Sequence, residues 1–206
     1  MKGWGLAIVA LLAATPAAGA DLGGRIELYS GGKPLRAAEA ADAMVYFRPR
    51  SPAAASPAPV EATMTTRRKQ FVPRVLAVTA GSTVRFPNED PILHNVFSTS
   101  PDNSFDAGQY HTGPGVSHTF AHAGLVKVYC NVHHSMFGYI LVLDTPHYAR
   151  PDATGRFELR DLPDGEGELV VFHDRAQPWR QRVLPSMTPE LAVRLDGVSP
   201  GTRSAL

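Results

Sequence analysis

Short apolar segments separated by Gly, Pro, Asn and Asp make up much of the chain between residues 62 and 145. The clearest of them are residues 75–78, 83–86, 125–129 and 139–143. Segments of this length, bounded by turn-forming residues, are typical of antiparallel strands. The pattern therefore predicts an all-β fold in which residues 62–145 form a β-sandwich.

A second strand pattern follows residue 146. In the sequence TGRFELRDLPDGEGELVVFH, apolar residues alternate on both sides of a turn at residues 163–165, which predicts two paired strands. Near the N-terminus, residues 24–26 and 44–47 flank a Gly-Lys-Pro turn and predict two further strands. Residues 36–44 are rich in Ala but too short for helix propensity to decide, so we expect a turn or a single helical segment there.

The stretch SPAAASPAP has no periodic apolar pattern and is typical of a semi-extended spacer, so we assign a linker to residues 51–61. We expect one small sandwich made from residues 21–50 and 146–195, interrupted by the sandwich of residues 62–145. Such an insertion is tolerated where the ends of a loop lie close together. Residues 196–206 are polar and terminal, and we expect them to be disordered.

The N-terminus has the features of a secretory leader. Lys2 precedes an apolar run at residues 6–14, and Ala18-Gly19-Ala20 offers small residues for cleavage. We predict a signal peptide over residues 1–20, cleaved after Ala20, and hence a periplasmic protein. The run is shorter than the ~20 apolar residues that span a bilayer, so no membrane span is expected in the mature form. The alternative is a retained N-terminal anchor.

Cysteine content and net charge reduce the number of function classes that fit the chain. The only cysteine is Cys130, which excludes an internal disulfide and calls for another role in an oxidising compartment. The formal net charge is +1 and includes Lys2 of the leader, so the mature side chains balance, and nucleic acid is not an expected partner. The basic residues at 67–69, with Arg74, either steer a negatively charged partner or form an ordinary solvated surface.

Three side chains of one short segment, KVYCNVHHSMFGYILV, suit a soft metal ion. Cys130, His133 and Met136 supply a thiolate, an imidazole and a thioether, which with a second imidazole form the trigonal site typical of copper electron transfer. His94 is the candidate for the second imidazole, and zinc is the main competing ion. His134 competes with His133, because neighbouring side chains of an extended loop cannot both point inward.

The two motifs F-P-N-x-D-x-x-x-H-N-V and C-x-x-H-x-x-M resemble those of the cupredoxin family, with a ligand loop of amicyanin length. The sequence around the two motifs also resembles that of methylamine-utilisation-type cupredoxin-like proteins. The resemblance covers about residues 62–145 and implies a Greek-key sandwich. It also implies one type 1 copper ion as cofactor, held by His94, Cys130, His133 and Met136. By the same resemblance, the backbone amide of Asn95 donates to the thiolate sulfur.

The segment after residue 150 resembles the regulatory-like sandwich domain found beside metallocarboxypeptidases. Its matching positions are Asp152, Gly155, Phe157, Leu159, Leu162, Pro163 and Gly165. The usual Tyr of that pattern is replaced by Glu-Gly-Glu at residues 166–168. This resemblance assigns no function to the second sandwich.

The resemblance implies single-electron transfer between redox partner proteins by an outer-sphere mechanism. The alternative is a copper-binding or copper-delivery module that uses the same ligands without carrying electrons. We do not expect an enzyme, because Cys130 lacks an oxyanion-forming motif or a third orienting group. We expect no second metal site among His111, His118 and His122, and we expect three aromatic side chains to lie in the core: Phe86, Phe97 and Phe120.

Overall fold

The computed structural model describes residues 19–51 and 56–197. Residues 1–18 of the predicted leader, 52–55 of the predicted linker and 198–206 of the predicted tail lie outside the described residues. Asp196 and Gly197, which were also assigned to that tail, instead end a strand, β18 (Leu191–Gly197). Apart from strands, the secondary structure of the described residues is one helical turn, α1 (Ala37–Ala40), and one 3-10 turn, η1 (Pro185–Met187). This confirms the all-β prediction. No helix in the described part of the chain is long and apolar enough to cross a membrane.

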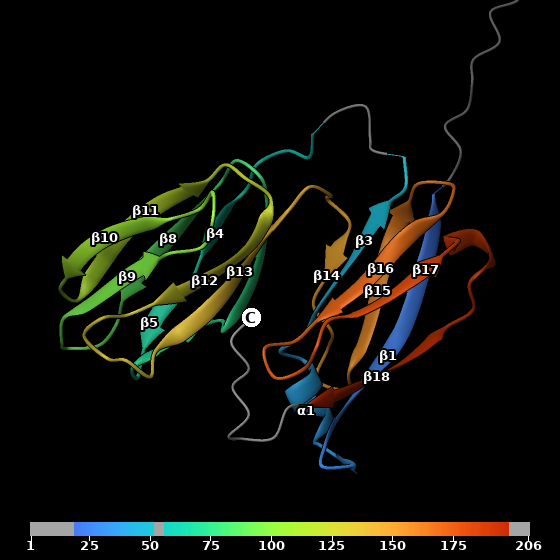
Figure 1. Ribbon diagram of the computed structural model, residues 1–206, viewed down its shortest axis with the longest axis horizontal. Helices are drawn as coiled ribbons and strands as arrows, with labels where there is room; N and C mark the ends of the chain where they lie inside the picture. Colours follow the sequence, from blue (N-terminus) through green and yellow to red (C-terminus); the bar gives the residue numbers. More distant parts are fainter. Residues whose placement is uncertain (1–18, 52–55, 198–206) are drawn as a thin grey trace, which may run out of the picture.

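Residues 61–143 form what we call the central lobe, drawn teal through green to yellow in Figure 1. Its first sheet has the strand order β10-β9-β12-β13-β7, and its second has the order β11-β8-β5-β6 with β4 beside β8. The strands are β4 (Glu61–Thr63), β5 (Thr65–Arg67), β6 (Gln70–Val72), β7 (Val75–Thr79), β8 (Ser82–Asn88), β9 (His94–Ser98), β10 (Phe105–Tyr110), β11 (Gly113–Phe120), β12 (Gly124–Tyr129) and β13 (Phe137–Leu143).

Alternation of buried and exposed side chains along these strands builds a single core between the two sheets. In β8 every second side chain is buried, and Phe86 packs with Phe120 and Val96 in that core. Phe86 and Phe120 are fully buried as expected, whereas the prediction for Phe97 is wrong. Phe97 is only partly buried because it points away from the core side of β9. Its ring lies tilted against that of Tyr129, with ring centroids 5.8 Å apart.

Both ends of the chain contribute to what we call the flanking lobe, residues 20–49 and 148–197. One of its sheets has the order β15-β1-β18 with β2 beside β1, and the other has the order β14-β3-β16-β17. The strands are β1 (Ala20–Ser30), β2 (Lys33–Pro34), β3 (Met44–Pro49), β14 (Tyr148–Ala149), β15 (Arg156–Leu162), β16 (Gly167–Phe172), β17 (Trp179–Val183) and β18 (Leu191–Gly197).

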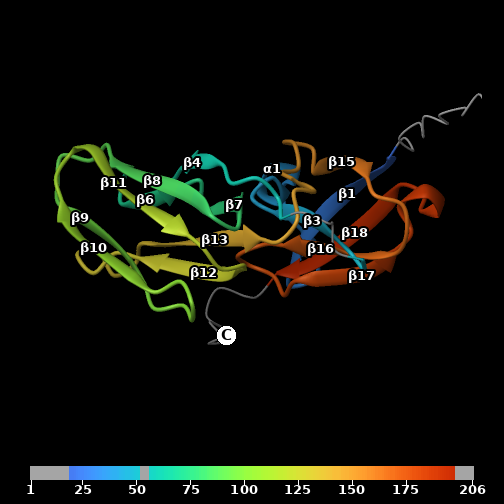
Figure 2. The ribbon, with the colours of Figure 1, turned by 90° about the horizontal axis from the view of Figure 1, so that it is seen from above.

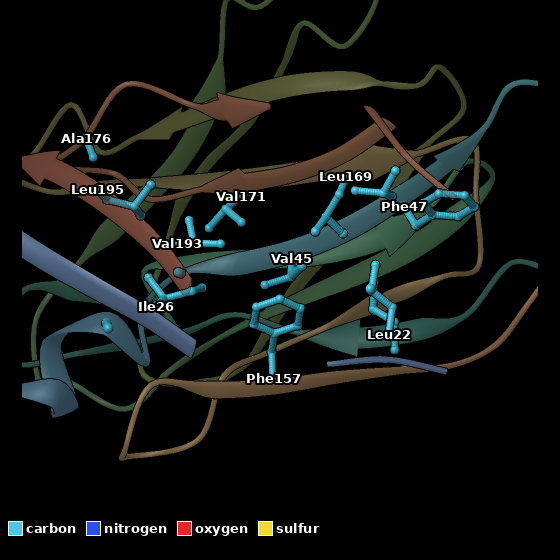
Figure 3. Packing of buried hydrophobic residues seen from close by; sticks show 14 of the residues in the cluster. Leu22, Ile26, Val45, Phe47, Phe157, Leu169, Val171, Ala176, Val193 and Leu195 are labelled. Carbon is cyan, nitrogen blue, oxygen red and sulfur yellow. The ribbon is translucent and has the colours of Figure 1, made fainter. Parts of the chain in front are cut away.

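The register of these strands brings distant segments into one core. Gly24 pairs with Phe157 in the antiparallel ladder between β1 and β15, and Ile26 pairs with Val193 in the parallel ladder between β1 and β18. Figure 3 shows Ile26, Val45 and Phe157 in the shared core between the two sheets. The division of the chain into two domains with the boundaries given above stays a prediction.

The two lobes lie side by side along the long axis of the molecule (Figure 2). An apolar cluster joins them, formed by one sheet of each lobe. The flanking lobe contributes side chains of β3 and β16, and the central lobe contributes side chains of β7 and β13. The buried members are Met44, Tyr46, Val75, Ala77, Leu141, Leu143, Val170 and Phe172.

Candidate metal centre

Three side chains predicted as metal ligands meet at one end of the central lobe. His94 is the first residue of β9, Cys130 follows the last residue of β12, and His133 lies in the loop between β12 and β13. Their donor atoms all lie within 4.8 Å of one another. His94 and Cys130 are buried, and His133 is partly buried. Two imidazoles and a thiol therefore converge from two loops, as a soft metal site requires.

A carboxylate fixes the orientation of the His94 ring. Nε2 of His94 lies 2.9 Å from Oδ2 of Asp90, and Nδ1 lies 3.7 Å from Sγ of Cys130. An ionised carboxylate can only accept a hydrogen bond, so Nε2 carries the proton. The lone pair of Nδ1 then faces the thiol, which is the tautomer that binds a metal ion.

Asp90 is itself held by the turn between β5 and β6. Its carboxylate accepts hydrogen bonds from the backbone amides of Arg68 at 2.6 Å and Lys69 at 2.8 Å. Burial alone would raise the pKa of the Asp90 carboxyl, but these two amides and His94 outweigh it and hold the pKa below its usual value. Asp90 therefore stays ionised. The signal for this role in the sequence is the position of Asp90, four residues before His94 in the motif F-P-N-x-D-x-x-x-H-N-V.

His133 offers an acceptor atom with nothing bound to it. Nδ1 of His133 is buried and has no hydrogen-bond partner among the described residues. The ring lies 4.8 Å from that of His94, centroid to centroid. Partial burial, then the neighbouring His94 and Lys69, lower the pKa of His133 and favour its neutral form. His134 is exposed and does not join the cluster, so of the two neighbouring histidines it is His133 that lies with His94 and Cys130.

Met136 closes the loop that carries Cys130 and His133. Its side chain is almost fully buried, in the same apolar cluster as Cys130. Its backbone amide donates to the carbonyl of His133 at 2.8 Å, and its carbonyl accepts from the amide of Cys130 at 3.3 Å. These bonds fold the loop tightly. The role of the Met136 sulfur as a fourth ligand stays a prediction.

Asn95 contacts the ligand loop through its side chain. Oδ1 of Asn95 accepts a hydrogen bond from the backbone amide of Asn131 at 3.3 Å, and Nδ2 donates to Asp106 at 2.7 Å. Among the described residues, no hydrogen bond joins the backbone amide of Asn95 to the sulfur of Cys130. Asn95 instead binds the ligand loop through its side chain, which holds Asn131, the residue after Cys130.

The remaining histidines of the central lobe form no second cluster. The ring of His118 stacks on Phe105 at 4.0 Å, and burial lowers the pKa of His118. His111 and His122 are exposed. Within residues 19–51 and 56–197, no other three side chains of the metal-binding types come together.

Replacing Asp90 tests the anchor of His94. Asp90→Asn leaves one oxygen where the amides of Arg68 and Lys69 and Nε2 of His94 all donate. We expect copper affinity to fall about 10- to 100-fold, the range for lost partners of metal-bound histidines. A chelator competition titration measures this affinity. Glu89→Gln is the matched control, because Glu89 is exposed and pairs with Arg67. Equal affinities of the two variants would contradict the role of Asp90.

Comparison with known proteins gives a limited result. No protein-family model and no curated protein matches the chain. Among solved structures, a purple cupredoxin from Nitrosopumilus maritimus covers 40% of this chain and 99% of its own, at 24% identity and a TM-score of 0.37. Amicyanin from Paracoccus versutus covers 48% of this chain and 98% of its own, at 22% identity and a TM-score of 0.38.

Proposed function

We propose that this chain is an exported copper protein that carries single electrons between periplasmic redox partner proteins by outer-sphere transfer. His94, Cys130, His133 and Met136 would hold one type 1 copper ion. The observation that supports this most directly is the convergence of two imidazoles and a thiol within 4.8 Å. Bound copper would supply a one-electron couple that none of these side chains provides alone.

The residues present fit such an ion. The buried Nδ1 of His133 has no hydrogen-bond partner among the described residues, and Nδ1 of His94 faces the thiol in the tautomer that ligates. A thiolate and a thioether favour copper over zinc. Asp90 and Asn95 fix the two loops that bring the donors together, so the side chains are oriented before any metal binds.

The experiment that tests the function is a copper titration of the mature protein followed by absorption spectroscopy. We expect an intense blue band from thiolate-to-copper charge transfer, saturating at one equivalent of Cu(II). Zinc added in the same amounts should give no such band. Copper binding without the band, or no copper binding, would contradict a type 1 site.

We also propose that the metal end of the central lobe docks an acidic partner. The backbone amides of Arg68 and Lys69 are bound to Asp90, so this basic turn lies beside the site, and both residues are exposed. Neither forms an ion pair within the described residues. Ile92 and Val132, which lie within the two motifs, add exposed apolar surface. Apolar surface with a charged rim is typical of transient interfaces.

Small charged oxidants test this docking face. In Lys69→Glu, oxidation of the reduced copper protein by anionic ferricyanide should slow about three- to tenfold at low ionic strength, and the effect should fade with salt. A cationic cobalt complex should show the opposite change. Lys33→Glu, an exposed lysine on β2 of the flanking lobe, is the control and should leave both rates unchanged. Equal effects of the two substitutions would contradict a steering role of the basic turn.

Substitution of Met136 tests the fourth ligand. Met136→Gln should retain copper but lower the reduction potential, because a harder oxygen donor replaces the weak thioether and favours Cu(II). Redox titration measures the potential, and a second buried methionine of the lobe, Met64, provides the control Met64→Leu. A potential equal to that of the parent protein would show that Met136 is not a ligand.

A further inference from the structure

The loop that carries the proposed ligands is closed by one pair of facing residues at the start of β13, which we call the neck of the loop. Phe137 directly follows Met136, and it pairs with Tyr129, which directly precedes Cys130. The hydrogen bond from the amide of Cys130 to the carbonyl of Met136 lies next to this pair. A shift of Phe137 would therefore move both ends of the loop that carries Cys130, His133 and Met136.

A guanidinium group covers the ring of Phe137. Cζ of Arg74 lies 3.9 Å from the ring centroid, a close cation–π stack. The backbone of Arg74 is fixed on the same strand, because its carbonyl accepts from the amide of Tyr139 at 2.8 Å. A Cβ on Gly138 would lie 3.2 Å from that carbonyl, so glycine permits this close approach. Arg74 is thus held at the neck of the loop by both backbone and side chain.

The same guanidinium group is bound by the flanking lobe. Nε of Arg74 donates to Oδ2 of Asp174 at 2.6 Å, across 100 residues of sequence. The Asp174 side chain is 6% exposed, so solvent screens this charge-assisted bond far less than a surface pair. One carboxylate of the flanking lobe therefore determines where the guanidinium lies.

The turn that carries Asp174 is held in place by contacts with Glu39 of α1. The neighbouring His173 is buried, and its Nε2 donates to the carbonyl of Glu39 at 3.0 Å. Nδ1 of His173 accepts from the amide of Arg175 at 3.1 Å, and the Arg175 guanidinium pairs with the Glu39 carboxylate at 2.5 Å. The turn is a rigid support within the flanking lobe.

We propose that Asp174 is a positioning residue for the ligand loop, acting across the lobe interface through Arg74 and Phe137. The flanking lobe then has a role at the metal site: it holds the neck of the loop closed. The inference rests on the proposed function, because that proposal identifies the ligands. The contacts among Asp174, Arg74 and Phe137 do not depend on which metal binds. Without the Asp174 carboxylate, the guanidinium loses its anchor and the ring of Phe137 loses its cover.

A second cross-lobe ion pair provides a matched control. Nε of Arg48 on β3 lies 3.3 Å from Oδ1 of Asp144, and both side chains are substantially exposed, at 37% and 59%. Asp144 follows the last residue of β13, whereas Phe137 is its first. Asp144→Asn therefore weakens the same interface at the end of the strand away from the ligand loop.

The test is amide hydrogen exchange of the metal-free, full-length mature protein, measured by NMR. In Asp174→Asn we expect the amides of Cys130 and Met136 to exchange about three- to tenfold faster, the effect of replacing a charge-assisted bond with a neutral one. Amides of β1 and β15 should be unchanged, and so should the whole Asp144→Asn protein. Arg74→Lys should reproduce the effect, because an ammonium lacks the planar fork that reaches ring and carboxylate together. The double variant should add little to either single one.

Outcomes of this test separate the inference from the proposed function. Loop exchange equal to that of Asp144→Asn, or additive effects of the two single substitutions, would overturn the role of Asp174 whatever the metal. Exchange faster across the whole protein would mean that Asp174 only stabilises the fold, which also overturns it. If the loop amides respond as expected but the parent protein forms no blue site, the positioning role stands and the copper proposal fails.

Discussion

Cys130→Ser is expected to abolish the blue absorption band completely while leaving the protein folded. Sγ of Cys130 lies 3.7 Å from Nδ1 of His94, and a serine hydroxyl at this position cannot supply the soft, deprotonated sulfur that produces the band. The side chain is 2% exposed and packs in the core of the central lobe. A buried hydroxyl there should cost no more than about 1–3 kcal/mol, because it can donate a hydrogen bond to Nδ1 of His94.

The measurement pairs an absorption spectrum after copper addition with a thermal unfolding curve of the metal-free protein. His134→Ala is the matched control: it removes an imidazole from the same loop, but one that is exposed and outside the cluster. This control should keep the full band. A blue band that persists in Cys130→Ser would eliminate the proposed site. A band lost in His134→Ala would show that His134, and not His133, is the ligand.

Local patterns predicted the parts of this molecule that depend on neighbouring residues. Alternation and turn residues located the strands that became β7, β8, β12 and β13, to within a few residues at each end. Because the spacing from Cys130 to Met136 lies within one short loop, that half of the site could be predicted without the fold. For residues 36–44 we expected a turn or a single helical segment, and they contain the one helical turn α1.

Contacts between distant segments could not be predicted in this way. The anchor of His94 exists because the β5–β6 turn reaches Asp90, which is more than twenty residues further along the chain. The bond between Arg74 and Asp174 requires the packing of two lobes. Phe97 shows the limit of pattern alone: an aromatic residue in a strand was expected in the core, but the strand's orientation turns it toward Tyr129. Topology, not propensity, decides such cases.

The carrier and the delivery module differ in how easily the ligand loop opens. His94, Cys130 and Met136 are nearly fully buried, and Asn95 fixes the loop through the amide of Asn131. A frame of this kind resists rearrangement, which should allow rapid electron exchange and slow release of the metal. We therefore expect the copper-loaded protein to show fast electron self-exchange and slow transfer of Cu(I) to a soft chelator.

Loosening the loop should reverse both rates together. In Asn95→Ala the amide of Asn131 loses its acceptor, so we expect Cu(I) transfer to rise and self-exchange to fall, each about tenfold, from a lost bond of about 1–3 kcal/mol. Asn103→Ala is the control, because Asn103 is also a buried amide, and it binds the carbonyl of His122 away from the site. Self-exchange is measured by NMR line broadening in mixtures of the two redox states, and transfer is measured with a coloured Cu(I) chelator. Slow exchange with rapid metal loss in the parent protein would overturn the carrier assignment and favour delivery, even if the spectrum is blue.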